Sequence, residues 1–221
     1  MLETLEGSLI VSCQAETDHP MRDTEMIARL AASALLGGAT ALRINSQVDV
    51  RAVRASTGVP IIGLDKQQGV RRSVITASPG QASDLVAAGA DIVAVDSTFE
   101  IVDDIAAHLS RVAEAARVPI MADVSTLDEG LRSWDAGAAF VGTTLAGYTP
   151  YTLREDTRPD IELVAALAAR GVRVIAEGRY TTPVEVAQAF DAGAFAVVVG
   201  GAITDPAAIT RRFVAATPRA R

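Results

Sequence analysis

Two residues of the sequence, Lys66 and Glu177, have the chemistry and the position to move a proton. Lys66 follows the apolar run 60–64, and Glu177 follows the run 172–176. Partial burial there disfavours the charged form of a lysine, so Lys66 could act as a base near neutral pH. Lys66 could equally clamp an anion or form a Schiff base with a carbonyl group. Glu177 could instead be a salt-bridge partner of Arg43 or Arg179.

Polar side chains also follow the other apolar runs of the sequence. They are Gln14, Arg43 with Asn45, Asp96, Asp123 with Ser125, and Thr143 with Thr144. Any one of them could be an ordinary loop residue, because loops are polar. Their joint occurrence predicts a convergent polar pocket, provided that the ends of the apolar runs meet in space.

Glycines follow the last two apolar runs, as Gly178 and as the pair Gly200-Gly201. Glycine lets the backbone approach a ligand closely, and the free amides at the start of a helix attract anions. These positions therefore predict a phosphate site, where Arg179 would add a local positive charge.

Other reactive residue types receive a structural interpretation. Cys13 ends an apolar run and is interpreted as a packed small hydrophobe, because no histidine is paired with it. His19 and His108 are isolated and lack the spacing of metal ligands, so no metal site is expected. The adjacent Arg71 and Arg72 are interpreted as a solvated basic pair in a loop.

An internal repeat indicates the fold that positions these residues. Gly-Ala followed by an apolar run occurs four times, at Gly38, Gly89, Gly137 and Gly193, each after a helical pattern. With four further apolar runs, the sequence predicts eight strands, near 8–13, 40–44, 60–64, 91–95, 118–122, 139–143, 172–176 and 195–199. The intervening segments predict eight helices, over 22–36, 47–57, 80–88, 102–116, 127–136, 159–170, 182–192 and 206–215. Continuous apolar strands alternating with helices predict a single-domain (β/α)8 TIM barrel over residues 1–221, with its active site at the carboxyl ends of the strands.

Composition narrows the class of partner. The chain has 221 residues, a net charge of −7 and 4% aromatic residues. Such an acidic balance argues against nucleic acid, and no apolar stretch is long enough to cross a membrane. One cysteine excludes an intrachain disulfide, and the first residues lack the basic start of a secretory signal, so we expect a cytoplasmic protein. A homodimer is the default expectation for a soluble oligomer.

Seven segments of the sequence, in order, resemble the N-acetylmannosamine-6-phosphate 2-epimerases of bacterial sialic-acid catabolism. These segments are Ile10–Ala15, Leu42–Asn45, Pro60–Gly63 with Lys66, Met121–Leu127, Phe140–Thr149, Ile175–Arg179 and Val197–Thr204. The resemblance covers nearly the whole chain. The chain departs from the family pattern in three loops, 16–20, 67–72 and 96–102.

The resemblance implies interconversion of N-acetylmannosamine 6-phosphate and N-acetylglucosamine 6-phosphate, an isomerase reaction of amino-sugar metabolism without a cofactor. It assigns the proton at carbon 2 to Lys66 and Glu177. It implies that Gln14, Arg43 and Asp123 hold the sugar, that Thr143, Thr144 and Tyr148 line the site, and that Gly178, Arg179, Gly200 and Gly201 bind the phosphate. A single-base and a two-base mechanism both remain open, as do a class I aldolase using Lys66 and a non-catalytic phosphosugar-binding barrel.

Overall fold

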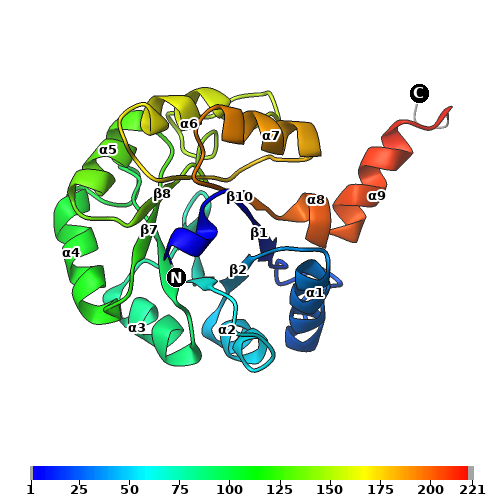
Figure 1. The fold of residues 1–221 in the computed structure, drawn as a ribbon, viewed down its shortest axis with the longest axis horizontal. Helices are drawn as coiled ribbons and strands as arrows, with labels where there is room; N and C mark the ends of the chain where they lie inside the picture. The colour runs from blue at the N-terminus through cyan, green and yellow to red at the C-terminus, as the bar shows by residue number, and fades with distance from the viewer. Residues whose placement is uncertain (1, 219–221) are drawn as a thin grey trace.

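The eight apolar runs form the parallel strands of a closed barrel (Figure 1). The structure is a computed structural model that describes residues 2–218. The barrel strands are β1 (Ser8–Cys13), β2 (Ala41–Asn45), β3 (Ile61–Leu64), β6 (Ile92–Asp96), β7 (Ile120–Asp123), β8 (Phe140–Gly142), β9 (Val174–Ala176) and β10 (Ala196–Val199). Each predicted strand is confirmed, with ends that differ by no more than two residues. Strand β10 pairs in parallel with β1 and closes the barrel, so the predicted TIM barrel is confirmed.

Burial on both faces explains why these strands are continuous apolar runs. Alternate side chains such as Ile62, Ile92 and Met121 fill the barrel interior, while their neighbours pack outward against the helices. The amino end of the barrel is closed by Phe140 and Phe195, whose ring centroids are 5.6 Å apart. Leu5, from the short 3-10 helix η1 (Leu2–Leu5), is fully buried in the same cluster.

Helices cover the outside of the barrel between successive strands. They are α1 (Thr24–Leu36), α2 (Gln47–Arg54), α3 (Pro79–Ala88), α4 (Ile105–Ala116), α5 (Leu127–Asp135), α6 (Ile161–Ala168) and α7 (Pro183–Asp191), followed by α8 (Gly201–Thr204) and α9 (Pro206–Ala215). Helices α5 and α7 both begin with a capping box, Thr126 with Glu129 and Thr182 with Glu185. The four repeated glycines all have positive φ, between 94° and 110°, as their place after a helix requires.

Three features of the fold have no counterpart among the predicted elements. Two are at the ends of the chain: η1 at the amino end of the barrel, and the separate short helix α8 before α9. The third is a hairpin inserted after β3, in which β4 (Lys66–Gln68) pairs antiparallel with β5 (Ser73–Ile75). Lys66 is therefore the first residue of a hairpin strand. No helix within residues 2–218 is both long and apolar enough to cross a membrane.

Close packing between β3 and the segment before β6 gives a test of the barrel wall. A Cβ atom on Gly63 would lie 2.7 Å from the Cβ of Ala90, whereas a Cβ on Gly80 would meet no atom closer than 3.9 Å. We expect Gly63→Ala to destabilise the protein by about 1–3 kcal/mol through overpacking. The control Gly80→Ala should be neutral or stabilising by up to about 1 kcal/mol. Urea unfolding measures both, and equal midpoints for the two variants would contradict this packing.

Candidate active site

A cavity of about 610 Å³ opens at the carboxyl ends of the barrel strands. Nine of the twelve site residues that the family resemblance assigns line it: Gln14, Lys66, Thr144, Tyr148, Glu177, Gly178, Arg179, Gly200 and Gly201. The other three, Arg43, Asp123 and Thr143, are buried beneath the cavity and do not line it. The predicted convergence therefore exists, but it has two layers, a cavity wall and a buried polar layer that supports it.

The buried layer is organised around the guanidinium of Arg43, whose side chain is only 1% exposed. Nη2 lies 2.6 Å from Oδ2 of Asp123, and Nη1 lies 2.8 Å from Oε2 of Glu177. Thr144 completes the cluster, because its hydroxyl is 2.6 Å from Asp123 Oδ1 and 3.1 Å from Glu177 Oε2. The sequence offered a salt bridge between Glu177 and Arg43 as one alternative, and this salt bridge is present.

The cluster contains one guanidinium and two carboxyl groups, so acidic groups outnumber basic ones. Burial alone would lower the pKa of Arg43, but the carboxylates of Asp123 and Glu177 outweigh it and raise that pKa. Burial raises the pKa of Glu177; the charge of Arg43 opposes this rise and the charge of Asp123 adds to it. Glu177 is thus a carboxyl group whose protonated form is favoured by its surroundings, which is a property of groups that transfer protons.

Local backbone contacts fix Glu177 at the cavity floor. The Thr143 hydroxyl donates to the carbonyl of Glu177 at 2.9 Å and accepts from its amide at 3.1 Å. Gly142, just before Thr143, has no room for a side chain, since a Cβ there would lie 2.4 Å from the Cε of Met121 and 2.7 Å from Oδ1 of Asp123. Thr143 therefore supports the site from below rather than facing a ligand.

Lys66 enters the cavity from the side of the hairpin. Its amide donates to Oδ1 of Asn45 at 2.9 Å, which ties the start of β4 to the end of β2. Its ammonium lies 3.2 Å from a carboxylate oxygen of Glu16, a residue that is 69% exposed in the loop after β1. The positive charge of Lys66 is also among the influences that lower the pKa of Glu177. Lys66 and Glu177 therefore border the same cavity.

The glycines lie together at one end of the cavity. Gly200 is the N-cap residue of α8 and provides no side-chain cap, and both Gly200 and Gly201 line the cavity. Gly178 has φ of 107°, a conformation that favours glycine. Arg179 is partly committed elsewhere: its guanidinium donates to the carbonyls of Gly147 and Asp156 and stacks 4.6 Å from the ring of Tyr148. It borders the predicted phosphate site while holding the loop after β8.

One sequence interpretation is wrong, and several cavity residues were missed. Arg71 is exposed, but Arg72 is only 12% exposed and its guanidinium contacts Asp96 and Glu100 instead of solvent. Asp96 ends an apolar strand and needs a cation when buried, but nothing in the sequence shows which arginine supplies it. Arg72 itself lines the cavity, as do His19, Glu16 beside Lys66 and Arg212 on α9, and none of them directly follows an apolar run.

The remaining reactive residue types are a cysteine and the histidines, and their contacts are as follows. Cys13 is fully buried, and burial raises the pKa of its thiol to about 12, consistent with a packed small hydrophobe. Nδ1 of His19 accepts from the amide of Met21, and Nε2 faces Asp205 at 3.3 Å. Within residues 2–218, no three histidine, cysteine or acidic side chains are grouped as metal ligands would be.

Comparison with known proteins gives a consistent family. Residues 27–219 match the family described as "Putative N-acetylmannosamine-6-phosphate epimerase". A protein of Caldanaerobacter subterraneus with the name "Putative N-acetylmannosamine-6-phosphate 2-epimerase" is 40% identical over 220 residues, which is 97% of this chain and 92% of that protein. One from Yersinia pseudotuberculosis with the same name is 45% identical over 201 residues, 90% of this chain and 85% of that protein. A solved structure, the N-acetylmannosamine-6-phosphate 2-epimerase from Clostridium perfringens, superposes with a TM-score of 0.89 at 36% identity, covering 96% of this chain and 94% of that one.

The raised pKa of Glu177 predicts a pH-dependent cost to stability. The folded protein holds a proton at this site up to a higher pH than the unfolded chain does, so the contribution of Glu177 to stability falls as the pH rises through that interval. Glu177→Gln removes this dependence and leaves Arg43 paired with Asp123. We expect the melting temperature of the variant, relative to the unsubstituted protein, to be higher at about pH 8 than at about pH 5.

Differential scanning fluorimetry at the two pH values measures this difference. The control is Glu114→Gln, an exposed glutamate on α4, for which the difference from the unsubstituted protein should not change with pH. If the melting temperature of Glu177→Gln stays at a constant offset at both pH values, the carboxyl group is not held in a destabilised charged form.

Proposed function

The chain belongs to the N-acetylmannosamine-6-phosphate epimerase family, and on that premise we propose that it interconverts N-acetylmannosamine 6-phosphate and N-acetylglucosamine 6-phosphate. The two sugars differ only in configuration at carbon 2. The observation that carries the proposal is the shared cavity of Lys66 and Glu177, with three glycines at one end of it. The whole barrel acts as one catalytic domain.

Inversion of carbon 2 requires a route through an enolate. The hydrogen on carbon 2 becomes acidic only when the ring is open and carbon 1 is an aldehyde. Removal of that proton breaks the C2–H bond, and the electron pair forms a C1–C2 double bond as the aldehyde oxygen becomes negative. Return of a proton to the opposite face of carbon 2 restores the aldehyde with inverted configuration. A base positioned for this step contributes about 10²–10⁴-fold in rate.

We assign the two proton transfers to Lys66 and Glu177. Both border the cavity, but they reach it differently: Lys66 comes from the start of the hairpin, and Glu177 from the floor after β9. Lys66 in its neutral form accepts a proton. Glu177, whose pKa burial raises, can hold one ready to return. Two groups on separate elements suit a reaction that needs proton transfer on both faces of one carbon.

The remaining predicted residues divide between binding and support. Oε1 of Gln14 is buried without a hydrogen-bond partner, so it is available to accept from a sugar hydroxyl or the acetamido N–H. Gly178, Gly200 and Gly201 bind the phosphate through backbone amides, with the charge of Arg179 beside them and Tyr148 next to it. Arg43, Asp123 and Thr143 act through Glu177 and Thr144, because they lie beneath the cavity and not on its wall. No cofactor is needed for this chemistry.

We place the enzyme in the cytoplasm with its substrate. A phosphorylated sugar carries a charge that a lipid bilayer excludes, so an enzyme that consumes it must share its compartment. The alternative of a class I aldolase needs Lys66 to attack a carbonyl carbon, and no contact of Lys66 favours that role over proton transfer. A binding protein without turnover would not need a buried carboxyl group of raised pKa at the cavity floor.

The proposed reaction predicts exchange with solvent at carbon 2. Purified protein incubated with N-acetylmannosamine 6-phosphate in heavy water should form the gluco epimer with deuterium at carbon 2, which NMR detects directly. Lys66→Ala and Glu177→Gln should each lower kcat by about 10²–10⁴-fold. Glu114→Gln again serves as the unaffected control.

Three outcomes would contradict parts of this proposal. No epimer at all refutes the assigned reaction, and epimer without deuterium refutes proton exchange with solvent as its mechanism. A substrate adduct trapped on Lys66 by borohydride would support the aldolase instead. The three outcomes differ in what is observed (epimer formation, deuterium at carbon 2 and an adduct on Lys66), so they cannot be confused.

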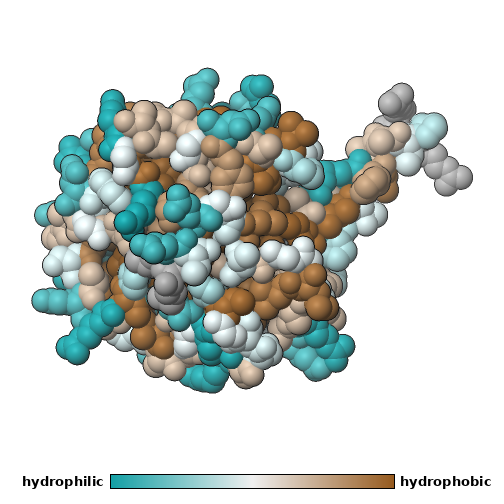
Figure 2. All heavy atoms as spheres, in the orientation of Figure 1, coloured by the Kyte–Doolittle hydropathy of each residue, from teal (hydrophilic) through white to brown (hydrophobic). Residues whose placement is uncertain are grey.

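We also propose that the protein is a homodimer in which α9 packs on a second copy. Figure 1 shows α8 and α9 leaving the barrel as an arm, and no residue of α9 is buried. Phe213 and Val214 are 74% and 52% exposed on that arm. Figure 2 shows apolar side chains gathered on the barrel flank between α7 and α1, beside the root of the arm. Two exposed apolar surfaces of one chain can cover each other across a two-fold axis.

The dimer is tested at Phe213. Light scattering should give twice the chain mass of 23.0 kDa for the unsubstituted protein. Phe213→Glu should shift it to the monomer, because the charge would be buried in the interface. Leu153→Glu, an equally drastic change at a residue that is 71% exposed in the loop after β8, should leave the mass unchanged. A monomer before any substitution would refute the dimer.

A further inference from the structure

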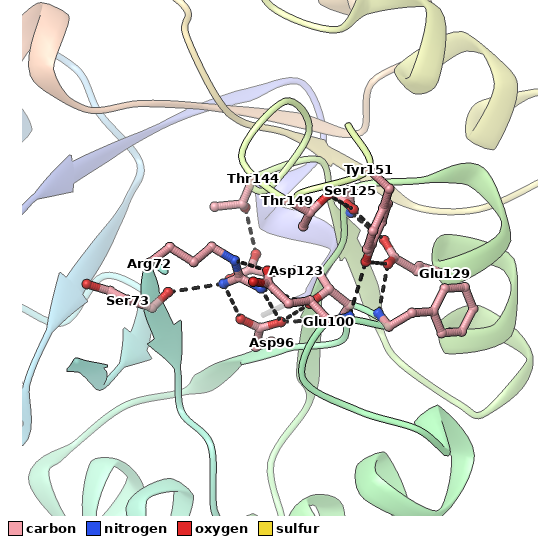
Figure 3. A network of polar contacts seen from close by, with 12 residues as sticks. Arg72, Ser73, Asp96, Glu100, Asp123, Ser125, Glu129, Thr144, Thr149 and Tyr151 are labelled. Atoms are coloured by element: carbon pink, nitrogen blue, oxygen red, sulfur yellow. Dashed lines mark hydrogen bonds and ion pairs between the residues drawn. The ribbon is translucent and has the colours of Figure 1, made fainter. Parts of the chain in front are cut away.

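The turn of the hairpin β4–β5 is fastened to the end of β6 by the side chain of Arg72 (Figure 3). Its Nη1 and Nη2 lie 2.6 and 3.2 Å from the two carboxylate oxygens of Asp96. Its Nε lies 2.9 Å from Oε2 of Glu100, and Nη2 also donates to the hydroxyl of Thr98 at 2.8 Å. One guanidinium thus holds two carboxylates, one at the end of β6 and one in the loop after it, and we call this group the Arg72 clamp.

The rest of the hairpin gives its tip little support. Each strand has three residues, and an isolated hairpin of that size is only marginally stable in water. The side chains of Gln67, Gln68, Val70 and Arg71 are exposed. At its base the hairpin is secured where Thr76 donates its amide to the carbonyl of Asp65 and accepts from the amide of Asp65 through its hydroxyl. The far end depends on the clamp.

Lys66 belongs to the same small unit. It is the first residue of β4 and lies opposite Ile75, while Gln68 lies opposite Ser73, the residue that follows Arg72. Three paired residues therefore connect the Arg72 end of the hairpin to the backbone that carries Lys66, whose amide is also bonded to Asn45. The position of the Lys66 backbone limits where its amine can go in the cavity.

The Arg72 clamp is also connected, through Glu100, to the loop after β8 on the other side of the active site. The amide of Glu100 donates to the hydroxyl of Tyr151, which in turn donates to Oε1 of Glu129 at 2.5 Å. Glu129 on α5 also accepts from the amide of Phe99 at 2.8 Å. Tyr151 lies in the loop after β8, which carries Thr144, the partner of Glu177. Figure 3 shows this chain of contacts running from the hairpin to that loop.

We propose that Arg72 is a positioning residue for Lys66. By clamping Asp96 and Glu100, it fixes the hairpin, and so the place of the lysine relative to Glu177 across the cavity. Arg72 itself transfers no proton and forms no bond to carbon 2. This inference rests on the proposed function, because it takes Lys66 to be one of the groups that act at carbon 2.

Arg72→Ala tests the clamp against Arg71→Ala, the change at the exposed neighbour in the same turn. We expect Arg72→Ala to lower kcat by about 10–100-fold, as expected for a displaced catalytic group, with KM changed less than about threefold. Arg71→Ala should keep both constants. A purely structural role would lower the active fraction and leave kcat per folded site unchanged, and that result would overturn the proposal. Titration of folded protein by its near-UV circular dichroism supplies the correction.

Arg72→Lys keeps a positive charge beside Asp96, so it guards against failure of the alanine variant to fold. An ammonium lacks the fork that reaches Asp96, Thr98 and Glu100 together. We expect kcat of this variant to lie between those of the alanine variant and the unsubstituted protein. If Arg72→Lys folds and has an unchanged kcat, the multiple contacts of the clamp do not matter and the proposal fails.

Amide hydrogen exchange tests the clamp without any substrate. Mass spectrometry should show faster exchange of peptides covering 66–75 in Arg72→Ala and Arg72→Lys than in Arg71→Ala, with the barrel strands unchanged. Unchanged exchange in this segment refutes the clamp even if the enzyme is active. Absence of epimerase activity before any substitution refutes the proposed function, and the two failures are therefore distinguishable.

Discussion

The ion pairs of Arg43 with Asp123 and Glu177 are the interaction on which the rest of the site depends. The guanidinium comes from β2, whereas its partners come from β7 and from the end of β9, so it crosses the barrel interior. A buried charge without a partner is strongly destabilising, and the three groups therefore hold one another in place. Because one cation faces two carboxylates, burial and the charge of Asp123 still raise the pKa of Glu177. The same arrangement that satisfies the buried arginine leaves a carboxyl group suited to exchange a proton.

Parallel strands bring these groups together, and the loops then decide what each can reach. The floor is rigid, because Thr143 bonds both to the amide and to the carbonyl of Glu177, and Gly142 is packed against Met121. The walls come from longer insertions: the hairpin that starts at Lys66 and the loop after β8 that carries Thr144. Arg72 and Arg179 fasten these two insertions with bonds to other loops. The proposed acid, Glu177, and the proposed base, Lys66, therefore both lie on elements that contacts to other parts of the barrel hold in place.

The sequence predicted what repeats and strand ends encode, and failed where partners are distant. The eight strands and eight of the cavity residues followed from local pattern, because parallel barrels place strand ends at one face, whereas Tyr148 followed only from the family resemblance. The interpretation of Arg72 as solvated failed because its partners, Asp96 at the end of β6 and Glu100 in the following loop, lie 24 and 28 residues away in the sequence. Likewise, nothing local distinguishes Arg43 and Asp123, which support the floor, from Gln14, which faces the cavity. Depth beneath a strand end is a property of tertiary packing.

An acidic chain can still attract a phosphorylated sugar. Most of its arginines near the site are already neutralised, so other groups must supply the attraction. Arg43 and Arg72 each face two carboxylates, and the guanidinium of Arg179 donates to two backbone carbonyl oxygens. In the proposed phosphate site, we therefore expect the attraction to come mainly from backbone amides around Gly178 and Gly200, with Lys66 and Arg212 among the positive charges that border the cavity. Amide dipoles act over a few ångströms, and salt screens the distant acidic surface beyond about 8 Å, so a net charge of −7 does not prevent anion binding. The geometry therefore favours a phosphate recognised at short range over one drawn in by a long-range field.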